Sequence, residues 1–183
     1  MRVMYGKAID DRWLAGEEDQ NAIFNVWASM IRRCTAPEYM ARNPSYSDVK
    51  IAAEWLRFSG FYWWAIDQDR KGKRLDKDLL SPACERKYSP DTCVFLSQQL
   101  NSFLVDCGAP GLPSGVIITP RKTFKPMVHT SPLTKRKESV SEFDCPQLAH
   151  AEWKDQKHKI ALEYASIESN HRVKSALELR YAN

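Results

Sequence analysis

Apolar residues recur at intervals of three and four in two stretches of the N-terminal half. The first stretch begins at Asn21 and predicts an amphipathic helix that ends near Thr35, with Asp19 as its N-cap. The second predicts a helix over residues 51–67, a region dense in Trp, Phe and Tyr. Aromatic residues at helical spacing usually fill a core. We therefore interpret these side chains as core rather than as a base-stacking platform.

The pattern changes in residues 75–105. Residues 75–80 (LDKDLL) alternate apolar and charged side chains, and residues 92–96 (TCVFL) are β-branched and aromatic, so each predicts a strand. Turn residues (YSPD, 88–91) lie between them, and a helix is predicted over 98–105 with Ser97 as its N-cap. The order strand, loop, strand, helix can bring Asp76 near Asn101.

The C-terminal part opens with a Gly- and Pro-rich segment, residues 108–115, which predicts a linker. Two strands are predicted in GVIITPRK and FKPMVHTS, and a weaker one at 139–143. A long helix is predicted from Pro146, and a last helix from about Asn170. The buried stripe expected on the long helix consists of Ala149, Trp153, Ile160, Tyr164 and Ile167.

The predicted fold class is therefore α+β. N-terminal helices brace a ββα unit within residues 1–107, residues 108–115 form a linker, and a small antiparallel sheet packs on a long helix in residues 116–183.

Composition limits the class of protein. With 183 residues and 43% apolar residues, the chain can bury a real core. No apolar run approaches the length of a membrane span, and the N-terminus lacks a signal-peptide core, so we expect a cytoplasmic protein without a membrane partner. The five cysteines are widely spaced and include no CxxC pair, which favours reduced thiols. The net charge of +4 does not by itself select a partner.

The segment 75–101 resembles the ββα-metal core of HNH endonucleases, in the form found in phage homing-type nucleases. The resemblance rests on LDKD, then YSP-T-C, then a helix that opens with Q-x-x-N. It implies that Asp76 and Asn101 are metal ligands, and oxygen ligands of this kind suit Mg²⁺ or Mn²⁺. The family's general-base His is replaced by Lys77, and its structural Asn by Thr92.

The candidate catalytic residues are thus Asp76, Lys77 and Asp78. A lysine is a poor base at neutral pH, and flanking carboxylates make it a poorer one. None of the four histidines lies in this segment. From the residues alone, solvated strand carboxylates and a polar residue at a helix N-terminus explain the same pattern equally well.

Positive charge gathers in residues 116–140, where six basic residues face one acid. Such clustering on a predicted sheet favours a nucleic-acid contact over a solvated charged face. Together with the following FDCPQLAHAEW helix, this segment is similar to the DNA-binding module of the plant ethylene-response-factor type. The resemblance implies DNA contacts by the basic side chains, namely Arg121, Lys122, Lys125, Lys135, Arg136 and Lys137.

The leading functional expectation is a phage-type HNH-like endonuclease that binds double-stranded DNA and hydrolyses a phosphodiester with a divalent cation, in the cytoplasm of a host cell. The alternative is an inactive HNH-like module that binds DNA or a protein, with a regulatory role or a host defence factor as its target. Lys77 favours the alternative, whereas Asp76, Asp78 and Asn101 together favour the enzyme. An RNA-binding protein is a third reading, because phosphate attraction alone does not choose between nucleic acids.

Overall fold

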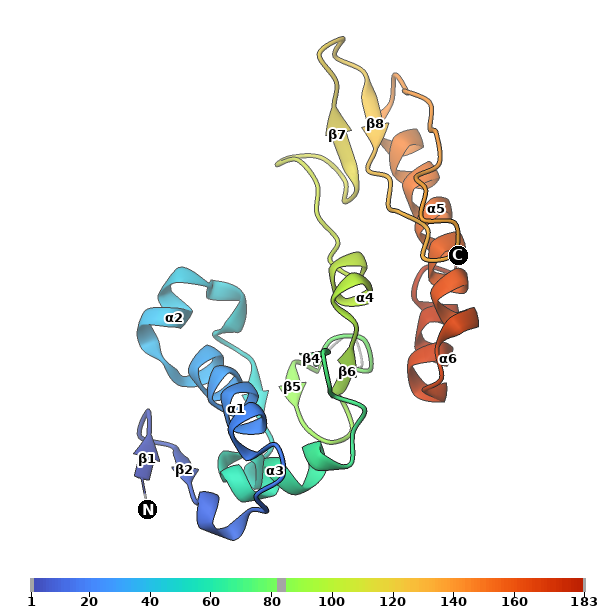
Figure 1. Cartoon of the computed structure of the whole chain (residues 1–183). Coiled ribbons are helices and arrows are strands. Elements are labelled where there is room, and N and C mark those ends of the chain that lie inside the picture. The colour runs from blue at the N-terminus through green and yellow to red at the C-terminus, as the bar shows by residue number, and fades with distance from the viewer. Residues whose placement is uncertain (1, 82–84, 183) are drawn as a thin grey trace. The chain divides into compact units, whose positions relative to one another are not determined.

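The computed structural model describes residues 2–81 and 85–182, and its fold is α+β, as predicted (Figure 1). The chain divides into two compact units, Met1–Gln98 and Gln99–Asn183. Among the described residues, no helix is both long and apolar enough to cross a membrane.

The first unit combines short strands with three α-helices. Its α-helices are α1 (Gln20–Thr35), α2 (Pro37–Arg42) and α3 (Phe58–Ile66), and 3₁₀ turns lie at Arg12–Leu14, Pro44–Tyr46 and Ala53–Leu56. Its strands are β1 (Arg2–Met4), β2 (Ala8–Asp10), β3 (Lys50–Ile51), β4 (Arg74–Asp76), β5 (Lys87–Tyr88) and β6 (Val94–Leu96). β1 pairs with β2 and β4 with β6, both antiparallel, whereas β3 and β5 pair in parallel.

The aromatic residues of α1 and α3 form the core of this unit, which confirms their interpretation as core. Trp27 and Phe58 are fully buried with their rings 5.5 Å apart, and Trp27 Nε1 donates a hydrogen bond of 2.7 Å to Trp55 O. Trp64 of α3 stacks on Phe95 of β6 with ring centroids 5.7 Å apart. The helices therefore brace the β4–β6 pair, as expected.

The single helix expected over residues 51–67 is wrong, because a break at Arg57 separates the 3₁₀ turn Ala53–Leu56 from α3. Arg57 is extended, and the buried Asp11 carboxylate accepts hydrogen bonds from Ser59 N and Ser59 Oγ, both at 2.9 Å. Asp11, which lies in a distant part of the sequence, thus accepts hydrogen bonds from donors at the start of α3. A Cβ on Gly60 would lie 2.2 Å from Glu54 O, so only glycine allows the chain to fold back this closely.

Two further local expectations need correction. Asp19 is the residue before α1 but makes no capping hydrogen bond, because its carboxylate pairs with Arg70 at 2.7 Å. The strand expected over 75–80 ends at Asp76, since Asp76 Oδ1 accepts hydrogen bonds from the N–H groups of Asp78 (3.0 Å) and Leu79 (2.8 Å). This side chain turns the backbone out of the ladder.

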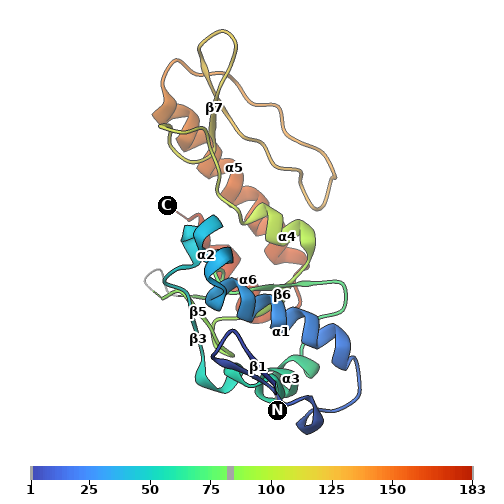
Figure 2. The same cartoon turned by 90° about the vertical axis from the view of Figure 1, so that its left-hand side faces the viewer.

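The second unit is a hairpin packed on a helix pair. It starts in α4 (Gln98–Phe103) and contains β7 (Val116–Ile118), β8 (Phe124–Pro126), α5 (Pro146–Ile167) and α6 (His171–Arg180). β7 and β8 pair antiparallel and both contact α5, which confirms the predicted sheet on a long helix (Figures 1 and 2). The third strand is reduced to one bridge between Phe143 and Phe124. The expected stripe on α5 holds except at Ile167, which is exposed.

The Gly- and Pro-rich segment 108–115 is a folded loop of the second unit rather than a spacer. Gly115 N donates to Cys107 O at 2.6 Å, and Ala109 N to Val116 O at 3.2 Å. Gly115 has a φ of +76°, and a Cβ there would lie 2.1 Å from the Trp153 ring. The glycine is therefore needed for both its backbone conformation and its close approach to α5.

Candidate functional site

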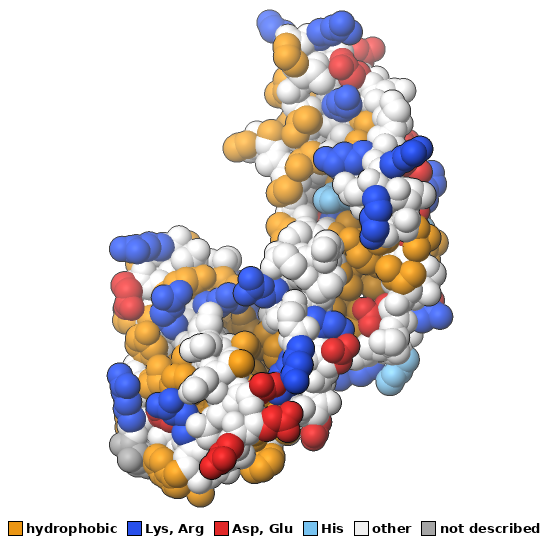
Figure 3. Space-filling model, in the orientation of Figure 1, with side chains coloured by type: hydrophobic (Ala, Val, Ile, Leu, Met, Phe, Trp, Pro, Cys, Tyr) orange, Lys and Arg blue, Asp and Glu red, His pale blue; other side chains and the backbone are white. Residues whose placement is uncertain are grey.

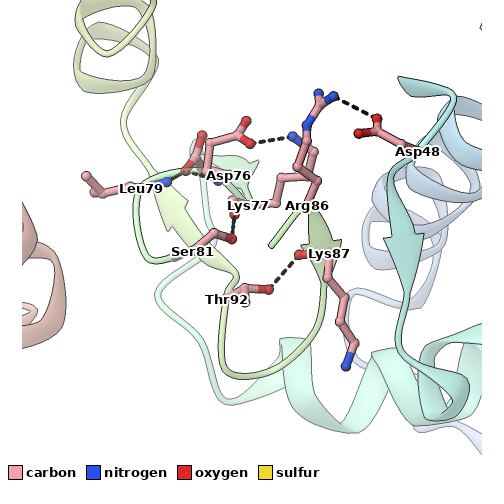
Figure 4. Close-up of polar contacts among 9 residues, drawn as sticks. Asp48, Asp76, Lys77, Leu79, Ser81, Arg86, Lys87 and Thr92 are labelled. Atoms are coloured by element: carbon pink, nitrogen blue, oxygen red, sulfur yellow. Dashed lines mark hydrogen bonds and ion pairs between the residues drawn. The ribbon is translucent and has the colours of Figure 1, made fainter. Parts of the chain in front are cut away.

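Asp76 stands at the end of β4, opposite Val94 of β6 (Figure 4). Burial raises the pKa of its carboxyl above the ordinary value, and the charge of Asp78 acts in the same direction, whereas the two backbone hydrogen bonds act against them. An aspartate in this position can serve as an oxygen ligand. In the structure, the Asp76 carboxylate holds the turn that follows β4.

Lys77 is buried, with a side chain that is 5% exposed. Its Nζ donates to Asp78 Oδ1 at 2.6 Å and lies 5.5 Å and 5.8 Å from the ring centroids of Tyr46 and Tyr88. The Lys77 ammonium is thus enclosed by a carboxylate and two aromatic faces. This geometry supports a structural role for Lys77, and its catalytic role stays a prediction.

Thr92 holds the loop that precedes β6. Its buried hydroxyl donates to Lys87 O at 2.6 Å and lies 2.9 Å from Ser89 Oγ (Figure 4). Thr92 thus braces this loop at the position where the resemblance implies a structural asparagine. β4, β6 and α4 follow the predicted order of strand, loop, strand and helix, but the loop also contains the short strand β5, whose Tyr88 was expected in a turn.

The predicted metal ligands lie on the two different units. Asp76 belongs to the first unit, and Asn101, which is half-buried, lies on α4 in the second. Among the described residues, no three His, Cys, Asp or Glu side chains gather as a metal-binding group. The oxygen atoms of Asp76, Asp78 and Asn101 have the right chemistry for Mg²⁺ or Mn²⁺. However, Asp76 Oδ1 and Asp78 Oδ1 already accept hydrogen bonds from this chain's own donors, so the fit to a metal rests on few free atoms.

The six predicted DNA-binding residues lie on the β7–β8 hairpin and on the long loop that follows it. Figure 3 shows Lys and Arg side chains (blue) over the surface of the second unit and also over that of the first. Lys125 is half-buried and the other five are exposed. Within the described residues, none of the six forms an ion pair. By contrast, many basic residues of the first unit are paired with carboxylates, among them Arg12, Arg57, Arg70 and Arg86. The charges of the hairpin are therefore available to an external anion.

Backbone geometry marks the same surface. Lys122 lies in the turn of the hairpin with a φ of 63°, and Lys135 lies in the following loop with a φ of 60°. This left-handed conformation costs a non-glycine residue about 1 kcal/mol.

Sequence reasoning missed a buried lysine in the second unit. Lys157 of α5 is fully buried, and its Nζ donates to Phe103 O, lies 3.1 Å from Asp106 Oδ1 and lies 3.2 Å from Tyr181 Oη. Tyr181 Oη in turn donates to Asp106 Oδ1 at 3.0 Å. This polar cluster joins α4, α5 and the end of α6. The sequence did not predict this cluster, because a lysine on a long helix is normally exposed.

Burial perturbs two cysteine thiols of the first unit, those of Cys34 and Cys93. Burial raises the pKa of Cys34 to about 11 and that of Cys93 to about 12. Among the described residues, Cys34, Cys93, Cys107 and Cys145 are free, which agrees with the expectation of reduced thiols. Cys84 lies outside the described residues.

No known protein family, curated protein or solved structure matches this chain. The class that the structure defines is an α+β protein of two units, in which β4, β5 and β6 are followed by α4 and the second unit carries a basic hairpin.

Proposed function

We propose that this protein binds double-stranded DNA through the β7–β8 hairpin and the loop that follows it. One observation carries the proposal: six basic side chains gather there and none has an ion-pair partner among the described residues. Phosphates attract such charges independently of base sequence, and the hairpin's strands and α5 hold them on a fixed support.

The test is the affinity for a labelled DNA duplex, measured by fluorescence anisotropy at several salt concentrations. In the double variant Arg121→Ala/Lys122→Ala, we expect weaker binding and a plot of log affinity against log salt that is less steep by about 2. The single variant Lys174→Ala removes an exposed charge from α6 and is the matched control. Unchanged binding in the double variant would remove the hairpin from the proposal.

The variant Lys122→Gly separates the effect of the charge on DNA binding from an effect on the folding of the hairpin. Glycine adopts the left-handed conformation of Lys122 without strain, so the hairpin should be at least as stable as in the native protein. DNA binding should nevertheless weaken, because one charge is lost. Parallel titrations with duplex RNA and with single-stranded RNA distinguish DNA recognition from general phosphate attraction.

Hydrolysis of a phosphodiester with a divalent cation is the second candidate. It is favoured by the carboxylate of Asp76 at the end of β4 and by the strand, loop, strand, helix order that follows. The ion pair of the buried Lys77 with the exposed Asp78 favours the alternative, an inactive HNH-like module that binds DNA or a host protein.

Supercoiled and linear DNA incubated with and without Mg²⁺ or Mn²⁺ decides between these two. Asp76→Asn and Asn101→Ala are the informative variants. Asparagine at position 76 keeps an oxygen that can accept the hydrogen bonds of Asp78 N and Leu79 N, so the turn survives the loss of charge. Metal-dependent nicking that both variants abolish would establish the nuclease. DNA binding without cleavage under any metal would leave the binding module.

A further inference from the structure

The first unit contains a pocket that none of the predicted sites uses. It has a volume of about 470 Å³ and lies between the start of α1, the loop before β4 and β6. The lining residues are Asp19, Ala22, Ile23, Val26, Arg70, Lys71, Gly72, Lys73 and Phe95. This volume lies within the range of small-molecule sites in proteins.

The pocket has two chemically distinct sides. Ala22, Ile23 and Val26 of α1, with Phe95 of β6, make one side apolar. The other side is a tight turn in which Lys73 N donates to Arg70 O at 3.0 Å and Gly72 takes a φ of +73°. A positive φ at the third residue of a turn is the signature of a type II turn. The turn therefore holds the cations of residues 70, 71 and 73 around a single bend.

The charge of the lining is positive. Three bases face one acid, Asp19, which already pairs with Arg70 at 2.7 Å and with Lys71 at 3.6 Å. The side chain of Arg70 is 11% exposed and held in place by this pair, whereas that of Lys71 is 77% exposed and can reach a ligand. Lys73 pairs outside the lining, with Asp69 at 2.6 Å. The pocket thus suits a ligand with an apolar body and an anionic end.

We propose that this pocket binds a single nucleotide, with its base against the apolar side and its phosphate on the turn 70–73. The choice of a nucleotide rests on the proposed DNA binding, because an end or an unpaired position of a bound strand supplies this combination of flat base and phosphate.

Calorimetric titration of the full chain with deoxyadenosine monophosphate tests the proposal, with deoxyadenosine, inorganic phosphate and phenyl phosphate as probes. We expect the monophosphate to bind at least tenfold more tightly than any of the other three. Phenyl phosphate binding as tightly as the monophosphate would overturn the assignment to a nucleotide, since any apolar anion would then suffice. Absence of binding by the monophosphate would overturn the site itself.

Two variants locate the binding. The double variant Lys71→Ala/Lys73→Ala should weaken the binding of the monophosphate at least fivefold and leave the weak binding of deoxyadenosine unchanged. Ala22→Phe places a ring in the pocket from an exposed helix position and should weaken both ligands. Lys7→Ala, an exposed lysine between β1 and β2, is the control for charge. An effect of Lys7→Ala equal to that of the double variant would overturn the site.

The outcome is separable from that of the proposed duplex binding. Arg121→Ala/Lys122→Ala lies in the other unit and should not alter monophosphate binding. Native duplex affinity together with failed monophosphate binding rejects the pocket alone. Failed duplex binding with intact monophosphate binding rejects the hairpin and leaves the pocket as a nucleotide site.

Discussion

The buried Lys157 gives a sharp test of what stabilises the second unit. In Lys157→Met the methionine replaces most of the aliphatic stem, so little packing is lost. The change removes the hydrogen bond to Phe103 O and the ion pair with Asp106, which is 3.1 Å away. The Phe103 carbonyl then loses its charged donor, at a cost of about 1–3 kcal/mol.

The ion pair adds a smaller amount. Asp106 has a side chain that is 34% exposed and keeps Arg180 at 4.0 Å, so water and Arg180 replace part of what Lys157 supplied. Burial also lowers the pKa of Lys157, although Asp106 acts against this effect, and losing a buried charge recovers some desolvation energy. We therefore expect a net loss of about 2–4 kcal/mol in the free energy of unfolding.

Urea denaturation followed by far-ultraviolet circular dichroism measures this loss. Lys159→Met is the control, because Lys159 lies on the same helix in an exposed pair with Asp155, and exposed pairs contribute little to stability. The double variant Lys157→Met/Asp106→Asn should be less destabilised than the sum of its single variants. If Lys157→Met unfolds within about 0.5 kcal/mol of the native protein, the lysine cluster does not stabilise the unit.

Two further outcomes follow from the second unit. Burial, followed by the charge of Lys157, lowers the pKa of His129 to about 4. The unfolded chain, in which a histidine has an ordinary pKa of about 6.5, therefore takes up a proton that the folded chain does not. Stability that is complete above about pH 6.5 should fall as the pH drops towards 4, by at most about 3 kcal/mol. His129→Gln should flatten this dependence in urea titrations across the same pH range, and an equal slope in both proteins would contradict the assignment. Gly115→Ala should lower the melting temperature far more than Gly111→Ala: both glycines have positive φ, but only at position 115 would the new Cβ meet the Trp153 ring, at 2.1 Å. Equal melting temperatures for the two variants would show that the loop yields to the added methyl group.

Periodicity in the sequence located most elements of this fold. The spacing of apolar residues gave α1 nearly to its ends, and Pro146 and Asn170 marked the starts of α5 and α6. Asn170 caps α6 as its residue type suggests, accepting hydrogen bonds from Arg172 N and Val173 N. These signals are local, so they predict the ends of helices without knowledge of the tertiary structure.

Some expectations failed because side chains from distant parts of the sequence form the decisive contacts. Asp11 starts α3 through Ser59, although 48 residues separate them. Asp19 leaves its helix for Arg70, 51 residues away. A local pattern cannot show that a polar group will find a distant partner. The start of α3 was therefore misplaced, whereas Asp19 stands at the expected N-cap position of α1 without the capping hydrogen bond.

In the candidate site, too, some features follow from the sequence and others only from the tertiary structure. The sequence by itself determined the strands β4 and β6 and the helix α4, but not the short strand β5 between them. It also determined that positive charge gathers on one hairpin and that the fold is α+β, because each of these features depends on residue type and spacing. Only the tertiary structure decided that Lys77 is enclosed by Asp78 and two tyrosine rings, that Lys157 is buried and that residues 70–73 line a pocket with α1. Burial and charge pairing depend on which elements meet in space, and the chemistry of a lysine changes with them.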